Sequence, residues 1–110
     1  MKPPDPLFMP SIGVDLVEIK KARSFYRTHA RRLDSFFNRA ERAYIRRGPR
    51  PHERVAALLA AKEAVFKTLS HSWMGIEGFR EISVKPLKKG LKISFIKNKK
   101  YVVALCAGTS

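Results

Sequence analysis

The hydrophobic pattern is strongest over residues 54–69, RVAALLAAKEAVFKTL, where apolar side chains recur at the three- and four-residue steps of a helix face. Ala, Leu, Lys and Glu dominate this stretch, no Gly or Pro interrupts it, and it predicts a long central helix. Its charged residues are Lys62, Glu63 and Lys67. Because little of so apolar a helix can face solvent, we expect some of these charges to lie buried beside a partner or a metal. The alternative is an exposed Glu63–Lys67 pair four residues apart, worth about 0.3 kcal/mol.

Residues 12–19 alternate between apolar and other side chains, which predicts a strand with Asp15 on the face opposite Ile12 and Val14. Aspartate is depleted in strands, so Asp15 either serves a function or caps the helix that follows. The preceding residues, 1–10, contain four prolines. They predict a loose N-terminal extension ahead of a single domain over residues 11–110.

Two further helices are expected between this strand and the central helix. Residues 18–30 combine a narrow apolar stripe with a basic opposite face. In residues 33–47, apolar side chains recur at helical spacing, and Asp34 can cap the first turn. The sequence RGPRP over 47–51 then interrupts helical structure, and the central helix is expected to begin near His52.

The last part of the chain reads as strands. Residues 70–78 suggest a loop, and 79–86, 91–96 and 101–106 suggest three strands joined by short turns. The fold class is therefore α+β, with one N-terminal strand, several helices including the long central one, and three antiparallel strands.

Composition narrows the class of protein further. The chain has 110 residues, 45% of them hydrophobic, which suits one globular domain with a modest core. Its single cysteine, Cys106, lies in the apolar run YVVALCA and is expected to be a core residue and not a nucleophile. No segment resembles a membrane span or a signal peptide, so we expect a cytoplasmic protein.

The charge balance indicates an anionic partner. Twenty-three Lys and Arg against nine Asp and Glu give a net charge of +14, which attracts nucleic acids, phosphorylated cofactors and acidic proteins. The phenylalanines stand in apolar clusters and not on an alternating strand platform, which makes nucleic-acid binding the less favoured reading.

Two motifs together resemble the small phosphopantetheinyl transferases, the holo-acyl-carrier-protein synthase family. AAKEAVFKTL over 60–69 resembles the family's signature helix, K-E-A/S-x-x-K, and SIGVDLVEI over 11–19 resembles its opening strand, I-G-x-D-x-x-x-I. Each motif alone is weakly specific, but both occur here in the family's order within 110 residues. The resemblance covers roughly residues 12–106 and implies the phosphopantetheinyl transferase fold.

The resemblance implies Mg²⁺-dependent transfer of 4′-phosphopantetheine from coenzyme A to a serine of apo acyl carrier protein, releasing 3′,5′-ADP. Asp15 and Glu63 would hold the Mg²⁺, which prefers carboxylate and phosphate oxygens. Glu63 and Lys67 are the expected catalytic residues, with Lys67 stabilising or protonating the leaving group. Lys62, Lys67 and His71 are expected to bind coenzyme A, although His71 is equally placed to cap the helix C-terminus.

The same resemblance implies protein partners. The basic helix is where the family binds its acidic carrier protein, so Lys21, Arg27 and Arg31 are the expected contacts, and a merely solvated surface is the alternative. Family members form trimers with the active site at the subunit boundary, so a homotrimer is expected.

The family's F-x-x-x-x-E-x-x-Y pattern is matched by Glu41 and Tyr44 together with Phe36 or Phe37. Glu41 either supports the metal site or pairs with arginines on its own helix. Either Glu41 or a water on the metal is a candidate for the base that deprotonates the serine.

Two departures from the family pattern keep other functions open. The usual arginine of R-F-A-A-K-E-A is Leu58, and the late histidine of S-x-S/T-H is absent from ISFI over 93–96. One alternative is therefore a catalytically weakened or inactive relative that acts as a binding module. The other is a basic nucleic-acid-binding protein, for which the net charge is the sole support.

Overall fold

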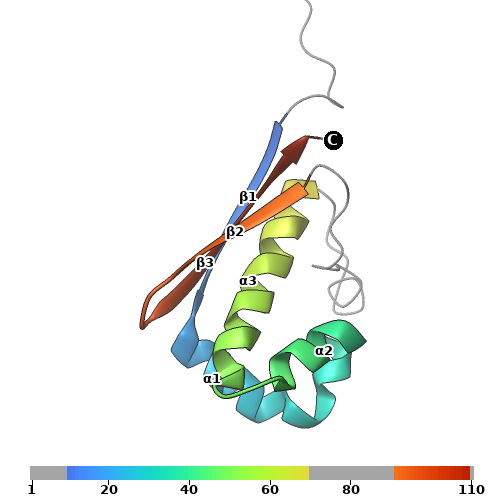
Figure 1. Cartoon of the computed structure of the whole chain (residues 1–110), viewed down its shortest axis with the longest axis vertical. Helices are drawn as coiled ribbons and strands as arrows, with labels where there is room; N and C mark the ends of the chain where they lie inside the picture. The colour runs from blue at the N-terminus through green and yellow to red at the C-terminus, as the bar shows by residue number, and fades with distance from the viewer. Residues whose placement is uncertain (1–9, 70–90, 110) are drawn as a thin grey trace, which may run out of the picture.

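The computed structural model describes residues 10–69 and 91–109 (Figure 1). The elements are β1 (Pro10–Glu18), α1 (Ile19–His29), a 3₁₀ segment η2 (Ala30–Ser35), α2 (Arg39–Arg46), α3 (Pro51–Leu69), β2 (Leu91–Lys97) and β3 (Tyr101–Thr109). This order confirms the α+β class and the long central helix. The expected loop over 70–78 and strand over 79–86 lie outside the described residues.

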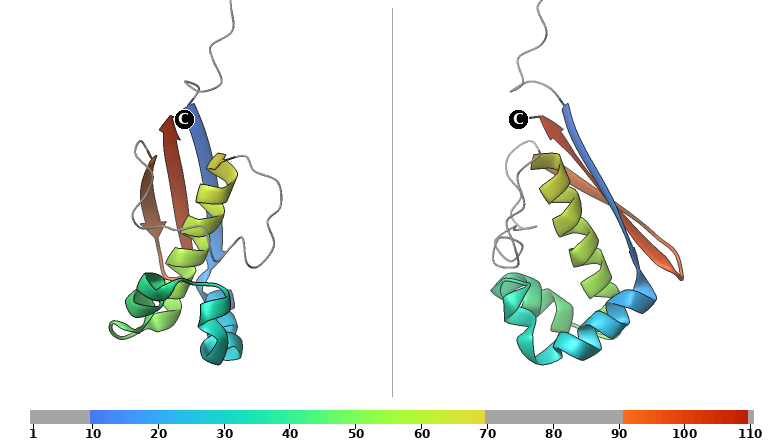
Figure 2. Two further views of the ribbon diagram at one scale, coloured as in Figure 1. Left: turned by 90° about the vertical axis from the view of Figure 1, so that its right-hand side faces the viewer. Right: turned by 180° about the vertical axis from the view of Figure 1, so that it is seen from behind.

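The strands form one antiparallel sheet in the order β1-β3-β2. The last strand therefore lies in the middle and joins the first strand of the chain to the hairpin partner β2. Asp15 pairs with Ala104, and Ala104 pairs with Phe95, so these three residues lie in one row on the same face of the sheet. Figure 2 shows α3 crossing that face.

Helix α3 is buried on most sides because the sheet covers one side of it and α1 and α2 lie against its N-terminal half (Figures 1 and 2). That position explains why its sequence is apolar nearly all round. Small side chains let it approach the sheet closely: Ala60, Ala61 and Ala64 are fully buried in one cluster with Ala104 and Cys106. The expectation that Cys106 is a core residue is confirmed. None of the helices in the described part of the chain is long and apolar enough to cross a membrane.

The single helix expected over residues 33–47 was wrong. The chain forms η2, leaves helical geometry after it, and starts α2 with Asn38 as the N-cap. The Asn38 side chain accepts a hydrogen bond from the Glu41 backbone N–H, and the Glu41 carboxylate accepts one from the Asn38 backbone N–H, both at 2.9 Å. This reciprocal capping box opens a new helix at Asn38 more effectively than Asp34 opens one four residues earlier.

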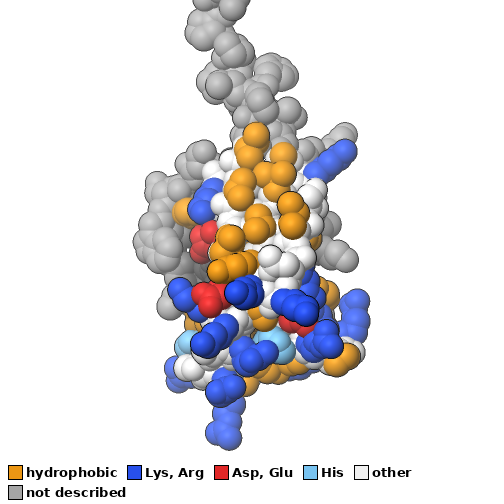
Figure 3. Space-filling model, turned by 90° about the vertical axis from the view of Figure 1, so that its left-hand side faces the viewer, with side chains coloured by type: hydrophobic (Ala, Val, Ile, Leu, Met, Phe, Trp, Pro, Cys, Tyr) orange, Lys and Arg blue, Asp and Glu red, His pale blue; other side chains and the backbone are white. Residues whose placement is uncertain are grey.

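Among the described residues, the face of the sheet that points away from α3 is apolar and exposed to solvent. Its large hydrophobic side chains are 41–73% exposed: Ile12, Val14, Leu16, Ile96 and Leu105. We call these five residues the apolar sheet face. Figure 3 shows hydrophobic side chains running up the molecule above a dense group of Lys and Arg. An apolar patch of this kind marks an interaction surface.

Candidate active site

Asp15 and Lys67 meet between the sheet and the central helix. The Lys67 Nζ lies 3.0 Å from the Asp15 Oδ1 and also donates to the Val14 backbone carbonyl at 3.1 Å. The Asp15 side chain is 19% exposed and that of Lys67 is 50% exposed. Because β1 places Asp15 on the helix-facing side of the sheet, its carboxylate is directed to α3, which supports a functional reading of this strand aspartate and argues against a capping role.

Glu63 lies on the same side of α3, one helical turn before Lys67. Partial burial raises the pKa of its carboxyl, the nearby Asp15 carboxylate raises that pKa further, and Lys67 lowers it. The Asp15 carboxylate is therefore near enough for its charge to act on Glu63. The structure thus brings together Asp15, Glu63 and Lys67, three of the residues that the sequence singled out.

This set of donors suits a hard divalent cation that also binds phosphate. Mg²⁺ is usually held by one or two carboxylates and completes its coordination with water and substrate phosphate oxygens. Within residues 10–69 and 91–109, no group of three or more His, Cys, Asp or Glu gathers at one point. The two partly exposed carboxylates of Asp15 and Glu63 are a donor set that fits Mg²⁺.

Lys62 and Glu41 lie elsewhere, in the interior. The Lys62 side chain is completely buried, and its Nζ lies 2.9 Å from the Glu41 Oε1, whose side chain is 4% exposed. The expectation that a charge on the apolar helix is buried beside a partner is confirmed for Lys62. Contact between Lys62 and coenzyme A stays a prediction, and this geometry directs its ammonium group to Glu41.

The other residues predicted from the sequence are the three basic residues of the expected docking surface and His71. Lys21 and Arg27 on α1 and Arg31 on η2 are exposed, as a docking surface requires. His71 lies outside the described residues.

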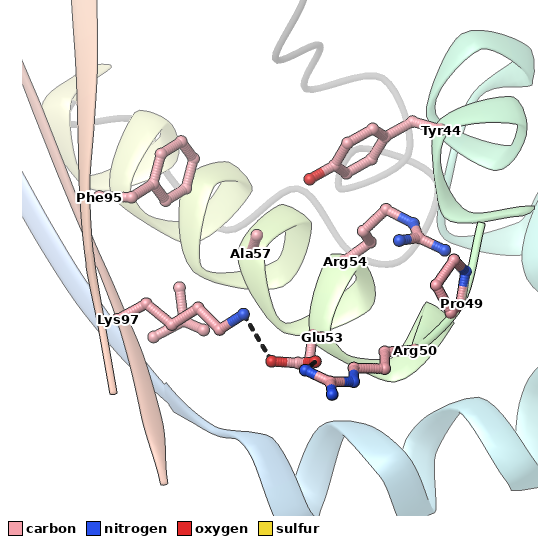
Figure 4. A pocket seen from close by; sticks show the side chains of 9 residues that line it. Tyr44, Pro49, Arg50, Glu53, Arg54, Ala57, Phe95 and Lys97 are labelled. Carbon is pink, nitrogen blue, oxygen red and sulfur yellow. Dashed lines mark ion pairs between the residues drawn. The ribbon is translucent and has the colours of Figure 1, made fainter. Parts of the chain in front are cut away.

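A cavity of about 450 Å³ lies on the β2 side of the helix–sheet interface (Figure 4). β3 separates it from Asp15, because Phe95 and Asp15 flank the same β3 residue. The Glu53 carboxylate pairs there with Lys97, and this hydrogen bond is the main cause that lowers the pKa of Glu53. The residues that line the cavity are Tyr44, Pro49, Arg50, Glu53, Arg54, Ala57, Phe95, Lys97 and Val102.

Sequence reasoning did not find this cavity. The local part of this cluster is Arg50 and Glu53, three residues apart at the start of α3, whose charged groups lie 3.7 Å apart. Phe95 and Lys97 join them only through the strand pairing, for which no local signal exists. At the start of α3, burial and then Arg23 lower the pKa of His52, which places a further polar contact at this end of the helix.

Comparisons with known proteins agree with the geometry. The sequence profile of the 4′-phosphopantetheinyl transferase superfamily matches residues 11–109. A holo-[acyl-carrier-protein] synthase of Clostridium kluyveri is 34% identical over 94 residues, which are 84% of this chain and 69% of the relative. The synthase of Moorella thermoacetica is 39% identical over 79 residues, which are 67% of this chain and 62% of that relative.

A solved structure has the same fold. The holo-(acyl-carrier-protein) synthase from Bacillus anthracis, in complex with CoA (3′,5′-ADP), superimposes with a TM-score of 0.72 over 91% of this chain and 96% of the other, at 23% identity. At that identity the likeness speaks for the fold, while the profile match spans nearly the whole chain. The chain belongs to the 4′-phosphopantetheinyl transferase superfamily, among relatives that are holo-[acyl-carrier-protein] synthases.

Proposed function

We propose that this protein transfers 4′-phosphopantetheine from coenzyme A to a serine of apo acyl carrier protein and releases 3′,5′-ADP. The serine oxygen forms a bond to the phosphorus that carries the pantetheine arm, and the serine loses its proton. The bridging P–O bond of the pyrophosphate breaks, and the ADP phosphate takes the electron pair. The observation that carries the proposal is the convergence of Asp15, Glu63 and Lys67 at one partly open position.

Each of these residues has a distinct part in the reaction. Asp15 and Glu63 supply carboxylate oxygens that would hold Mg²⁺, and the ion, when bound, would offset negative charge on the pyrophosphate. The Lys67 ammonium group pairs with Asp15 in this structure, and its side chain is exposed enough to donate a hydrogen bond to a substrate phosphate oxygen. Glu41 is a poor candidate for the base that deprotonates the serine, because its carboxylate is buried against Lys62.

The proposed acceptor is an acidic carrier protein in the cytoplasm. It would bind to the basic surface formed by Lys21, Arg27 and Arg31. These side chains are exposed on neighbouring helical segments. Attraction between opposite charges mainly raises the association rate and the specificity, and salt screens it. Reversing the charge at all three positions should raise the KM for carrier protein and weaken its salt dependence, with the KM for coenzyme A unchanged.

We also propose that the protein is a homotrimer with its active sites at the subunit boundaries. The apolar sheet face supports self-association, since it leaves five large hydrophobic side chains exposed on one surface. β1 is an edge strand of the described sheet, so a neighbouring subunit that covers Val14 on the outer face would also approach the edge along which Asp15 faces α3.

The decisive experiment is mass spectrometry of an apo carrier protein incubated with this protein, coenzyme A and Mg²⁺. The expected result is a gain of one phosphopantetheine arm that EDTA abolishes. Asp15→Ala and Glu63→Ala should each abolish the gain while circular dichroism shows an intact fold. Glu53→Ala is the matched control, because Glu53 is a partly exposed glutamate on the same helix but beside Lys97. Wild-type transfer by either of the first two variants would refute the metal assignment.

A catalytically weakened relative is the second candidate, and Leu58 is the observation that favours it. Leu58 stands where the family has an arginine, and it is 7% exposed within the core cluster at the N-terminal half of α3. A cation that the family uses is thus replaced by a packing residue. No mass gain with several carrier proteins, together with a melting temperature that coenzyme A still raises, would favour this candidate.

A further inference from the structure

The buried ion pair between Lys62 and Glu41 joins α3 to α2. The Lys62 side chain has no exposed surface, its Nζ lies 2.9 Å from the Glu41 Oε1, and it lies 5.9 Å from the centre of the Phe37 ring. Placing two charges in the interior costs several kcal/mol for each ion unless the geometry and the further hydrogen bonds are good. A buried ion pair of this kind seldom adds much net stability. Its geometry therefore points to another role.

The Glu41 carboxylate is held in place by its own helix. The same Oε1 atom accepts a hydrogen bond from the Asn38 backbone N–H at 2.9 Å, as part of the capping box that starts α2. A capping-box glutamate has little freedom to move, because its side chain closes a ring with the first turn. Lys62 is therefore bound to a fixed point on α2.

The buried apolar side chains of α3 nearest to Lys62 are mostly small. The buried surface of the helix around Lys62 consists largely of the small side chains of Ala60, Ala61 and Ala64, which interlock less than large ones. A cavity of about 320 Å³ also lies between α2 and α3, with Glu41, Tyr44 and Leu58 among its lining residues. Glu41 of the ion pair lines this cavity, so the ion pair adds a specific contact between α2 and α3 where apolar packing between them is incomplete.

The rotation of α3 decides where the site residues point. Successive residues of an α-helix are turned by about 100°, so a Lys62 side chain held toward α2 leaves Glu63 directed away from α2 and toward β1. Lys67 follows one turn after Glu63 and reaches Asp15 at 3.0 Å. A rotation of α3 by a few tens of degrees would separate Glu63 and Lys67 from Asp15.

We propose that Lys62 and Glu41 are positioning residues, whose ion pair fixes the rotation of α3 so that Glu63 and Lys67 face Asp15. The proposal rests on the proposed function: its metal-binding part rests on the site at Asp15 and Glu63, and its kinetic part rests also on the transfer reaction. It differs from the phosphate contact that the family resemblance implies for Lys62, since here the ammonium acts through Glu41 and never touches coenzyme A.

Three variants test the pair. Lys62→Met keeps the length of the side chain and removes its charge, and Glu41→Gln keeps a capping-box side chain and removes the carboxylate. The double variant Lys62→Met/Glu41→Gln leaves no uncompensated buried charge, so it folds even if a single variant does not. Lys97→Met and Glu53→Gln are the matched controls, because they break a different ion pair of α3, Lys97–Glu53, whose Lys97 side chain is 52% exposed.

Two readouts are needed: the dissociation constant for Mn²⁺, measured by electron paramagnetic resonance without substrates, and kcat and KM for coenzyme A. We expect each folded variant of the pair to weaken Mn²⁺ binding and to lower kcat by about 10- to 100-fold, the usual effect of losing a residue that orients metal ligands. The KM for coenzyme A should stay close to that of the wild type. The double variant should lose no more than a single one, because both changes remove the same contact. The controls should match the wild type.

The other outcomes are equally clear. A raised KM in Lys62→Met with a normal KM in Glu41→Gln would assign Lys62 to phosphate binding and overturn the proposal. A lower melting temperature with unchanged kcat and Mn²⁺ affinity would reduce the pair to a structural role and overturn it as well. If the wild type transfers nothing, the proposed function fails, and the Mn²⁺ affinities of the same variants still decide whether the pair positions the carboxylates.

Discussion

Replacing Leu16 by aspartate should convert the protein to a monomer. Leu16 lies on β1 in the apolar sheet face and is 54% exposed in the isolated chain. It shares a cross-strand row with Val103 and Ile96, so it is surrounded by apolar neighbours on the same face. A partner subunit that covers the apolar sheet face must therefore cover Leu16.

The size of the effect follows from the exposed area. Burying a leucine side chain completely is worth about 1.5–3 kcal/mol, so covering the exposed half of Leu16 contributes about 1 kcal/mol per subunit. Five similar side chains provide about 5 kcal/mol per subunit, or about 15 kcal/mol in a trimer. A trimer forms through two associations, each of which costs roughly 4–15 kcal/mol in lost freedom, so the gain and the cost are of the same order. Aspartate forfeits the contribution of Leu16 and adds several kcal/mol for each buried carboxylate, which is enough to reverse the balance.

Sedimentation equilibrium measures the result directly. The wild type and an Ala43→Asp control, whose site on α2 is exposed and distant from the apolar sheet face, should form the same assembly. Leu16→Asp should sediment as a monomer with an unchanged circular dichroism spectrum. A monomeric wild type at micromolar to millimolar concentration, or an assembled Leu16→Asp, would refute the reasoning.

Four further predictions concern stability and reactivity. Since the folded-state pKa of Glu63 is raised, its ionised form opposes folding, so Glu63→Gln should raise the metal-free melting temperature at neutral pH, and the gain should vanish as the pH falls below the usual carboxyl range. Since the pKa of Glu53 is lowered, Glu53→Gln should lower the neutral-pH melting temperature, and this loss should vanish as the pH falls through the lowered pKa. Because Cys106 is fully buried, iodoacetamide should modify it in denaturant and not in the native protein. Asn38→Ala should cost about 1 kcal/mol of unfolding free energy by chemical denaturation, whereas Asn38→Asp, which keeps a capping oxygen, should cost less.

Each of these predictions can fail in a specific way. The pH arguments are wrong if Glu63→Gln and Glu53→Gln shift the melting temperature in the same direction at neutral pH. Rapid native alkylation of Cys106 would contradict its place in the core. Equal losses in Asn38→Ala and Asn38→Asp would show that the cap contributes little to α2.

The sequence by itself determined the elements whose signals are local. The central helix follows from the periodicity of 54–69, and the strand that carries Asp15 follows from its alternation. Two short motifs indicated the family. Asp15 stands at its expected position in the strand motif, and Glu63 and Lys67 stand at theirs in the helix motif. Some charge on the central helix was expected to lie buried beside a partner, since so apolar a helix has little solvent-facing surface, and the structure shows this for Lys62.

Only the tertiary structure decided which distant residues meet. Lys67 and Asp15 are separated by 52 positions, and Lys62 and Glu41 by 21. Their contacts depend on β1 pairing with the last strand and on α2 folding back against α3, which no local pattern specifies. The start of α2 was misjudged because Asp34 and Asn38 are both good caps, and the reciprocal bond with Glu41 distinguishes them. The exposure of the apolar sheet face also emerged only from the fold, since alternation along a strand shows that its two faces differ but not which one a helix covers.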